Sequence, residues 1–121
     1  MNSLDYALAN FNRGLAYYQK NDYDSAIADY TEVIRIKPKY VAAYFNRGIA
    51  YYGKDDYDHV IVDYTEAIRI KPKYAAAYFN RGIAYENNGD KNRAIADFEF
   101  ALSLDPKNTQ YRDNLQRARG C

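Results

Sequence analysis

Apolar residues recur along the chain at the spacing of a helix face. The first such set follows the i, i+3, i+4, i+7 pattern and comprises Leu4, Leu8, Phe11, Leu15 and Tyr18. Residues 20–22 form a short polar break, and a second helical pattern then runs as far as Pro38. Proline cannot continue a helix and disfavours helical geometry in the residue before it, so this second helix should end near Ile36. The pattern predicts a helix-turn-helix unit.

Polar residues stand where each helix should begin. Ser3 or Asp5 is expected to cap the first helix, and Asp22 or Asp24 the second, because side-chain oxygens at these positions accept hydrogen bonds from free backbone N–H groups. An arginine lies in the middle of the first helix of each unit, at positions 13, 47 and 81. We expect its stem to pack while the guanidinium group reaches Asp29, Asp63 or Asp97, or the face of a tyrosine ring.

The unit recurs every 34 residues. Residues 10–18 have near copies at 44–52 and 78–86, and the same interval separates Gly14, Gly48 and Gly82, and Pro38, Pro72 and Pro106. Such a period indicates stacked helical repeats. We predict one domain over residues 1–121, with repeats at 7–40, 41–74 and 75–108. Residues 109–119 break the pattern and should form a seventh, capping helix with a narrow apolar stripe of Tyr111, Leu115 and Ala118.

Composition excludes several classes of function. A net charge of +1 gives no general attraction to nucleic acid or to an anionic membrane. No apolar run is long enough to span a membrane and no secretory leader is present, so we expect a cytoplasmic protein. Cys121 is the single cysteine and His59 the single histidine, which leaves no disulfide framework, metal site or catalytic constellation. We therefore expect neither an enzyme nor a cofactor.

These residues resemble the tetratricopeptide repeat, a 34-residue helix-turn-helix unit. The family's small residue falls on the three glycines above, its tyrosine on Tyr17, Tyr51 and Tyr85, and its second-helix aromatic on Tyr30, Tyr64 and Phe98. The resemblance covers residues 7–108. It implies an all-α, right-handed α-solenoid that acts as a non-catalytic scaffold, with a protein or peptide as partner. A mid-helix glycine fits this reading, since the second helix would cross too closely there for a Cβ.

The resemblance also implies a binding surface. In this family the first helix of each repeat lines a concave groove that takes a peptide or helix. The groove residues here would be Phe11, Asn12, Leu15, Tyr18, Phe45, Asn46, Ile49, Tyr52, Phe79, Asn80, Ile83 and Glu86. Amides would bond the backbone of a bound segment, and aromatic groups would take its apolar side chains. Alternatively, the phenylalanines and isoleucines only complete the packing between repeats.

One subclass of the family holds the terminal carboxylate of chaperone tails with lysine, asparagine and arginine side chains. Only Asn46 matches that set. Phe11 stands for the first lysine, Leu15 for the first asparagine, Ala76 for the second lysine and Asn80 for the arginine. Without a cation at these positions, we predict that the carboxylate clamp is absent.

A rival interpretation is a structural unit with no cognate peptide, either an idealised repeat or a fragment of a longer array. The first helices of repeats two and three are nearly identical, whereas repeats selected for one peptide usually diverge in the groove. The N-terminal end has no capping device, so homo-oligomers formed through repeat stacking are also predicted.

Overall fold

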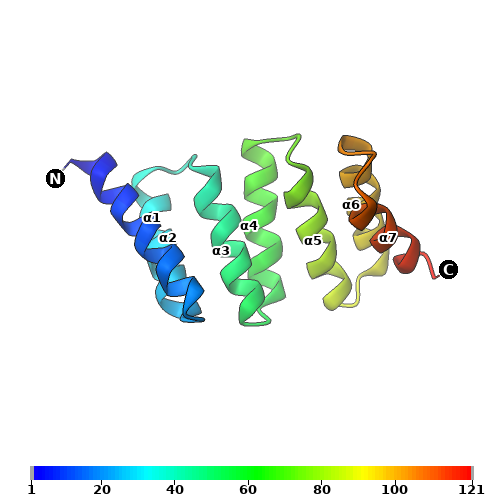
Figure 1. The fold of residues 1–121 in the computed structure, drawn as a ribbon, viewed down its shortest axis with the longest axis horizontal. Coiled ribbons are helices and arrows are strands. Elements are labelled where there is room, and N and C mark those ends of the chain that lie inside the picture. Colours follow the sequence, from blue (N-terminus) through cyan, green and yellow to red (C-terminus); the bar gives the residue numbers. More distant parts are fainter. Residues whose placement is uncertain (1, 121) are drawn as a thin grey trace.

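The computed structural model describes residues 2–120. Within these residues there are seven helices and no strand: α1 (Ser3–Gln19), α2 (Tyr23–Ile36), α3 (Val41–Gly53), α4 (Tyr57–Ile70), α5 (Ala75–Asn87), α6 (Lys91–Leu104) and α7 (Thr109–Ala118). The helices pack in sequence order and form a row that separates the two ends of the chain (Figure 1). This confirms the predicted all-α solenoid. Cys121, and any role for its thiol, lies outside the described residues.

Side-chain caps begin the second helix of each repeat. Asp22, Asp56 and Asp90 each accept a hydrogen bond from the backbone N–H three residues later, at 3.2–3.3 Å. Helix α1 is different, because Asn2 caps it by accepting from the N–H of Asp5 at 2.8 Å. The expectation of Ser3 or Asp5 as its cap is wrong, since both residues lie inside the first turn.

Prolines and residues in the left-handed conformation mark where the helices end. Helices α2 and α4 stop at Ile36 and Ile70, two residues before a proline, as the sequence predicts. The turns between paired helices each pass through one left-handed residue, which is Asn21 (φ 61°), Asp55 (φ 59°) or Gly89 (φ 81°). Asparagine, aspartate and glycine are the residues that tolerate this conformation best.

A glycine in the middle of each first helix permits close crossing by its partner. A Cβ placed on Gly14 would lie 2.7 Å from the ring of Tyr30, and one on Gly82 would lie 2.7 Å from the ring of Phe98. Both distances are too short for an ordinary carbon contact. The absence of a side chain is therefore what allows the large second-helix aromatic to be buried at the crossing.

Alanines join one repeat to the next. Ala43 and Ala50 of α3 are fully buried among residues of α1 and α2, and Ala77 and Ala84 of α5 occupy the corresponding places one repeat later. Helix α7 docks on α6 in a similar way, with Tyr111 and Ala118 at the positions that Ala77 and Ala84 hold in α5. The buried residues there are Tyr111, Leu115 and Ala118, as the sequence predicts.

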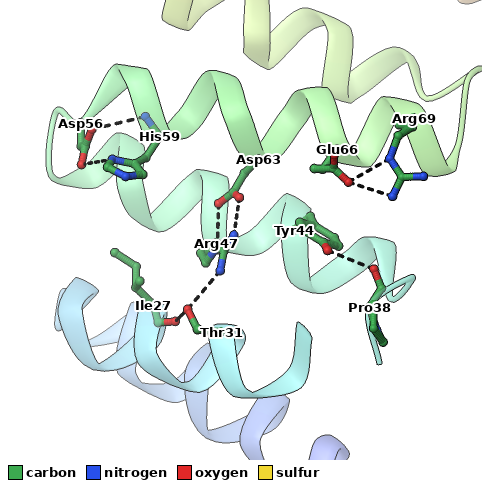
Figure 2. A network of polar contacts seen from close by, with 10 residues as sticks. All are labelled: Ile27, Thr31, Pro38, Tyr44, Arg47, Asp56, His59, Asp63, Glu66 and Arg69. Carbon is green, nitrogen blue, oxygen red and sulfur yellow. Dashed lines mark hydrogen bonds and ion pairs between the residues drawn. The ribbon is translucent and has the colours of Figure 1, made fainter. Parts of the chain in front are cut away.

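A mid-helix arginine joins the two helices of its own repeat and also bonds the repeat before it. Arg47 donates through Nε and Nη2 to Asp63 at 2.9 and 2.7 Å, and through Nη1 to the hydroxyl of Thr31 in the preceding repeat at 3.1 Å (Figure 2). Arg81 makes the same contacts to Asp97 and Thr65. The sequence predicts the arginine–aspartate pairs, and the threonine contact adds a bond between repeats.

Burial dominates the electrostatics of the central pair. The residue Asp63 is 1% exposed. Burial raises the pKa of its carboxyl group, while the hydrogen bonds and charge of Arg47 act in the opposite direction. Burial lowers the pKa of Arg47, but the hydrogen bond and charge of Asp63 outweigh it and raise that pKa overall. Each charge therefore depends on the other for its place in the core.

Candidate functional site

The twelve predicted groove residues lie on the first helices of the three repeats. Only Phe79 among them is buried; Asn12, Leu15 and Tyr52 are exposed and the others are half-buried. The row therefore presents side chains from α1, α3 and α5 to solvent, which a binding surface requires. How far each residue can contact a ligand depends on the partners that it already has.

The phenylalanines pack mainly within the protein. Phe11 lies edge-on to Tyr40 at 5.4 Å between ring centroids, and Phe45 stacks on Tyr74 at 4.9 Å. Phe79 stacks at 4.6 Å on the ring of a cap residue, Tyr111. Of the two alternatives for this row, the geometry favours inter-repeat packing, with only the outer edges of Phe11 and Phe45 open to a ligand.

A pocket of about 160 Å³ opens between α3 and α5. The residues that line it are Ile49, Tyr52, Tyr64, Asn80 and Ile83. Two isoleucines and two tyrosine rings make it mainly apolar, and four of the five residues come from the predicted row. Tyr64 belongs to the second helix of repeat two, so its place in the groove was missed; the sequence identifies it only as a core aromatic.

One polar contact lies at this pocket. Asn80 donates through Nδ2 to the hydroxyl oxygen of Tyr64 at 3.1 Å. Tyr64 is almost wholly buried, and burial raises the pKa of its phenol, so the hydroxyl keeps its proton at neutral pH. Within residues 2–120 that hydroxyl donates to no acceptor. It is therefore a hydrogen-bond donor available to an occupant of the pocket.

Asparagines form a row across the groove. Asn12 and Asn46 make no side-chain hydrogen bond within residues 2–120, so their amides are free to bond a ligand. The row extends to Asn114 on α7, which donates to the carbonyl of Gln110 at 2.9 Å. Sequence reasoning missed Asn114, although it stands 34 residues after Asn80 and the spacing alone could have revealed it.

The C-terminal end of the row is closed by an ion pair. Arg117 of α7 donates through both terminal nitrogens to Glu86, at 2.8 and 2.9 Å, and also bonds Asn114 at 2.8 Å. The hydrogen bond to Glu86 raises the pKa of Arg117. Glu86 therefore lies on the first helix of its repeat with the other predicted groove residues. Its carboxylate is already paired with Arg117, so it is not a free acidic group for a ligand.

The tyrosines at the margin support one another. Tyr18 lies 5.7 Å from Tyr23 and Tyr52 lies 5.6 Å from Tyr57, measured between ring centroids. Asn87 also donates to the hydroxyl of Tyr52 at 3.4 Å. The ring contacts come from the second helix of the same repeat, and the Asn87 contact comes from α5. They limit the freedom of the exposed rings, which reduces the entropy lost when a ligand packs against them.

The single histidine has a structural environment. His59 stacks on Tyr51 at 4.7 Å between ring centroids. Its Nδ1 lies 2.7 Å from a carboxylate oxygen of Asp56 (Figure 2).

Residues 2–120 contain no group of three or more potential metal ligands. None of the helices in this part of the chain is both long and apolar enough to cross a membrane.

Comparison with known families gives consistent matches. A model described as TPR repeat matches residues 14–55, and one described as Tetratricopeptide repeat matches residues 41–74 and 75–108. Together they span most of the chain, from residue 14 to residue 108. A search of curated proteins found no match.

Solved structures with the same fold include peptide complexes. The first TPR of Spaghetti (RPAP3), bound to the HSP90 peptide SRMEEVD, is 27% identical, with a TM-score of 0.91 over 96% of this chain and 92% of that one. The second TPR domain of human RPAP3, in complex with the HSP70 peptide SGPTIEEVD, is 30% identical, with a TM-score of 0.91 over 98% of both chains. The Arabidopsis OM64 TPR domain is 28% identical, with a TM-score of 0.92 over 98% of both.

Proposed function

Because the chain belongs to the tetratricopeptide repeat family, whose domains are protein–protein interaction modules, we propose that it is a non-catalytic scaffold that binds a peptide segment of another protein. The binding surface is the row of first helices α1, α3 and α5. The pocket between α3 and α5 is the observation that carries this proposal, because it combines an apolar lining with a buried hydroxyl donor.

The chemistry of the pocket defines the ligand class. Ile49 and Ile83 favour an apolar side chain, and the phenol of Tyr64 supplies a hydrogen-bond donor beside it. The free amides of Asn12 and Asn46 can each bond both the N–H and the C=O of a ligand backbone. An extended segment fits these groups best when it has one apolar residue flanked by uncharged residues, whose backbone groups bond the amides.

Two of the structural relatives are bound to peptides that end in EEVD, and this chain is expected to differ from them. Phe11, Leu15, Ala76 and Asn80 occupy the positions where the clamp subclass carries its other ligands, and none of the four is a cation. Arg117 of α7, which contacts the predicted groove residue Glu86, is already paired with it. We therefore propose a partner other than a chaperone tail of the SRMEEVD type.

Peptide display on the full chain tests the proposal. Selected peptides should be enriched in apolar residues over the unselected library, and a variant with Asn46 and Asn80 both replaced by Ala should retain fewer of them. For one selected peptide, Asn46→Ala should weaken binding roughly fivefold, the value of about one hydrogen bond. Asn92→Ala on the exposed surface of α6 is the matched control and should leave binding unchanged. A lack of apolar enrichment over the unselected library, or equal retention of peptides by the wild type and the double variant, would refute the proposal.

The clamp prediction has a separate test. Fluorescently labelled SRMEEVD should show no saturable binding to the wild-type chain. A graft of the missing clamp groups, Phe11→Lys, Leu15→Asn, Ala76→Lys and Asn80→Arg, should create binding that weakens as salt is added. Tight, salt-sensitive binding by the unmodified chain would show that its cations form a clamp from other positions.

A second candidate function, self-association as a structural unit, is favoured by a different surface. That surface is the exposed side of α1, which carries the same residue types that join the repeats internally.

A further inference from the structure

Helices α1 and α6 each carry a surface of the kind that joins one repeat to the next. At each internal junction, the first helix of one repeat packs on the second helix of the repeat before it. Helices α3 and α5 do this through corresponding residues, namely two buried alanines and an arginine that bonds a threonine of the preceding repeat. Helix α1 has the same residues, and within residues 2–120 no second helix packs on them. We call its exposed side the α1 face, formed by Tyr6, Ala9, Arg13 and Ala16.

Exposure distinguishes the α1 face from its internal copies. Ala9 and Ala16 are exposed, whereas their counterparts in α3 and α5 are fully buried. The side chain of Arg13 is 62% exposed, against 17% for Arg47, although both form the same bidentate pair with an aspartate of the next helix. The α1 face therefore has the composition of a buried junction and the exposure of an open surface.

Tyr6 strengthens the comparison. Its counterpart Tyr40 packs on Phe11, and its counterpart Tyr74 stacks on Phe45, so in each case the tyrosine meets the phenylalanine of the preceding repeat. Tyr6 has no preceding repeat within residues 2–120 and is 45% exposed.

The other half of the junction lies at the opposite end of the molecule (Figure 1). Phe79 corresponds to Phe11 and Phe45, and the ring of Tyr111 in α7 covers it. Glu99 of α6 corresponds to Thr31 and Thr65, and instead of bonding a mid-helix arginine it pairs with Arg119 at 2.7 Å. Helix α7 thus occupies the place that a fourth first helix would take.

We propose that the α1 face docks on α6 of a second copy of this chain, in the place that α7 occupies within the monomer. Two complementary contacts would form across this junction: Tyr6 would stack on Phe79, and Arg13 would pair with Glu99. The charges of the second contact are opposite, whereas the internal junctions have a neutral threonine there. The contact joins unlike surfaces, so it can propagate into a head-to-tail chain.

Helix α7 sets the threshold for this association. It is tethered to α6 by a short turn, so it competes with a second copy at an effective concentration in the millimolar range. The wild-type chain is therefore monomeric at micromolar concentration, and association needs a released α7. When α7 is released, Asn12 of the second copy takes the place of Asn114, and the asparagine row continues from one molecule into the next.

A mixing experiment tests the proposal without forming polymers. The acceptor is the full chain with Tyr111→Ala and Leu115→Lys, which releases α7, and with Ala16→Glu, which blocks its own α1 face. The donor is the wild-type chain, which has an open α1 face and a docked α7. Under reducing conditions, analytical ultracentrifugation should show each protein alone as a monomer and the equimolar mixture as a heterodimer.

The matched control is a donor that carries Ala16→Glu. Residue 16 is exposed in the monomer, so this change leaves the donor folded, but the corresponding Ala50 and Ala84 have no room for a larger side chain. The control donor should form no heterodimer. A folded acceptor that stays monomeric with the wild-type donor overturns the proposal, as does association that is insensitive to Ala16→Glu.

Hydrogen exchange on the wild-type chain provides a measurement that needs no destabilised variant. As the protein concentration rises toward the millimolar range, amides of α7 should lose protection while those of α6 keep it, and Ala16→Glu should abolish the change. Protection of α7 that does not depend on concentration overturns the proposal even where the acceptor fails to fold.

Discussion

Replacing Arg47 tests whether the arginine row stabilises the fold or contacts a ligand. Arg47→Met keeps a long apolar side chain but removes the two hydrogen bonds and the charge that hold the carboxylate of Asp63. Asp63 is 1% exposed, so water cannot replace the lost partner. Removing one member of such a buried pair costs about 3–5 kcal/mol, which is a large part of the roughly 5–15 kcal/mol that stabilises a typical domain.

Arg13→Met is the matched control. Arg13 binds Asp29 with the same geometry, at 2.9 and 2.6 Å, but its side chain is mostly exposed because no repeat within residues 2–120 covers it. Water can reach Asp29 once this arginine is shortened, so the expected loss is much smaller than that of Arg47→Met. The difference between the two variants measures burial rather than bond geometry.

The pH dependence of the stability of Arg47→Met provides a second test of the buried pair. Burial already raises the pKa of Asp63, and replacing Arg47 removes the two largest effects that oppose it, the hydrogen bonds and the charge of the guanidinium group. A carboxyl group whose folded pKa exceeds its unfolded value stabilises the fold below the unfolded pKa, and this contribution is lost as pH rises through the folded pKa. The deficit of Arg47→Met should therefore be largest at neutral pH and should shrink on acidification.

Urea unfolding followed by circular dichroism, at pH 7 and at pH 5, measures these differences. The double variant with Arg47→Met and Asp63→Leu should recover most of the loss, because it removes the orphaned charge together with its partner. An Arg47→Met variant within about 0.5 kcal/mol of Arg13→Met at pH 7 would falsify the buried-pair interpretation.

Three further predictions concern the glycines and the core tyrosines. Gly82→Ala should lower the melting temperature, because overpacking against the Phe98 ring costs about 1–3 kcal/mol and outweighs the roughly 1 kcal/mol of helix propensity gained; a higher melting temperature would contradict the close crossing. Burial raises the pKa of Tyr30 to about 12 from an ordinary 10.0, so its contribution to stability is present below pH 10 and is lost as pH rises toward 12. Tyr30→Phe should reduce the alkaline loss measured by urea unfolding, and an unchanged pH profile would count against this origin. Gly89→Ala should cost roughly 1–2 kcal/mol in the same assay because the backbone there has φ 81°, and a neutral result would mean that the turn relaxes.

Much of the fold could be predicted because its signals are local. Proline ends α2 and α4, and aspartate caps α2 and α4, through contacts that span only a few residues. The interval of 34 residues then repeats these local signals along the chain. The cap of α1 was assigned to the wrong residue, since Asn2, Ser3 and Asp5 are all suitable and only the actual start of the helix selects Asn2.

The candidate site was only partly predictable. Repeat position identified the helix face but not the contacts that each side chain makes. Phe45 and Phe79 have the same place in their repeats, yet α7 buries the second one, and Arg117 neutralises Glu86 across a distance of 31 residues. Tyr64 reaches the groove pocket from the second helix, so a search restricted to first helices could not include it.

By itself, the sequence determined the repeat, the helices and the residues at their crossings, because helix periodicity, proline and glycine act through short-range geometry. Only the tertiary structure decided which members of each row are free to bind. Exposure depends on the neighbouring helix, and that neighbour differs between the first and last repeats. Within residues 2–120 no helix precedes α1 to cover Arg13, whereas Phe79 lies under the ring of Tyr111 in α7.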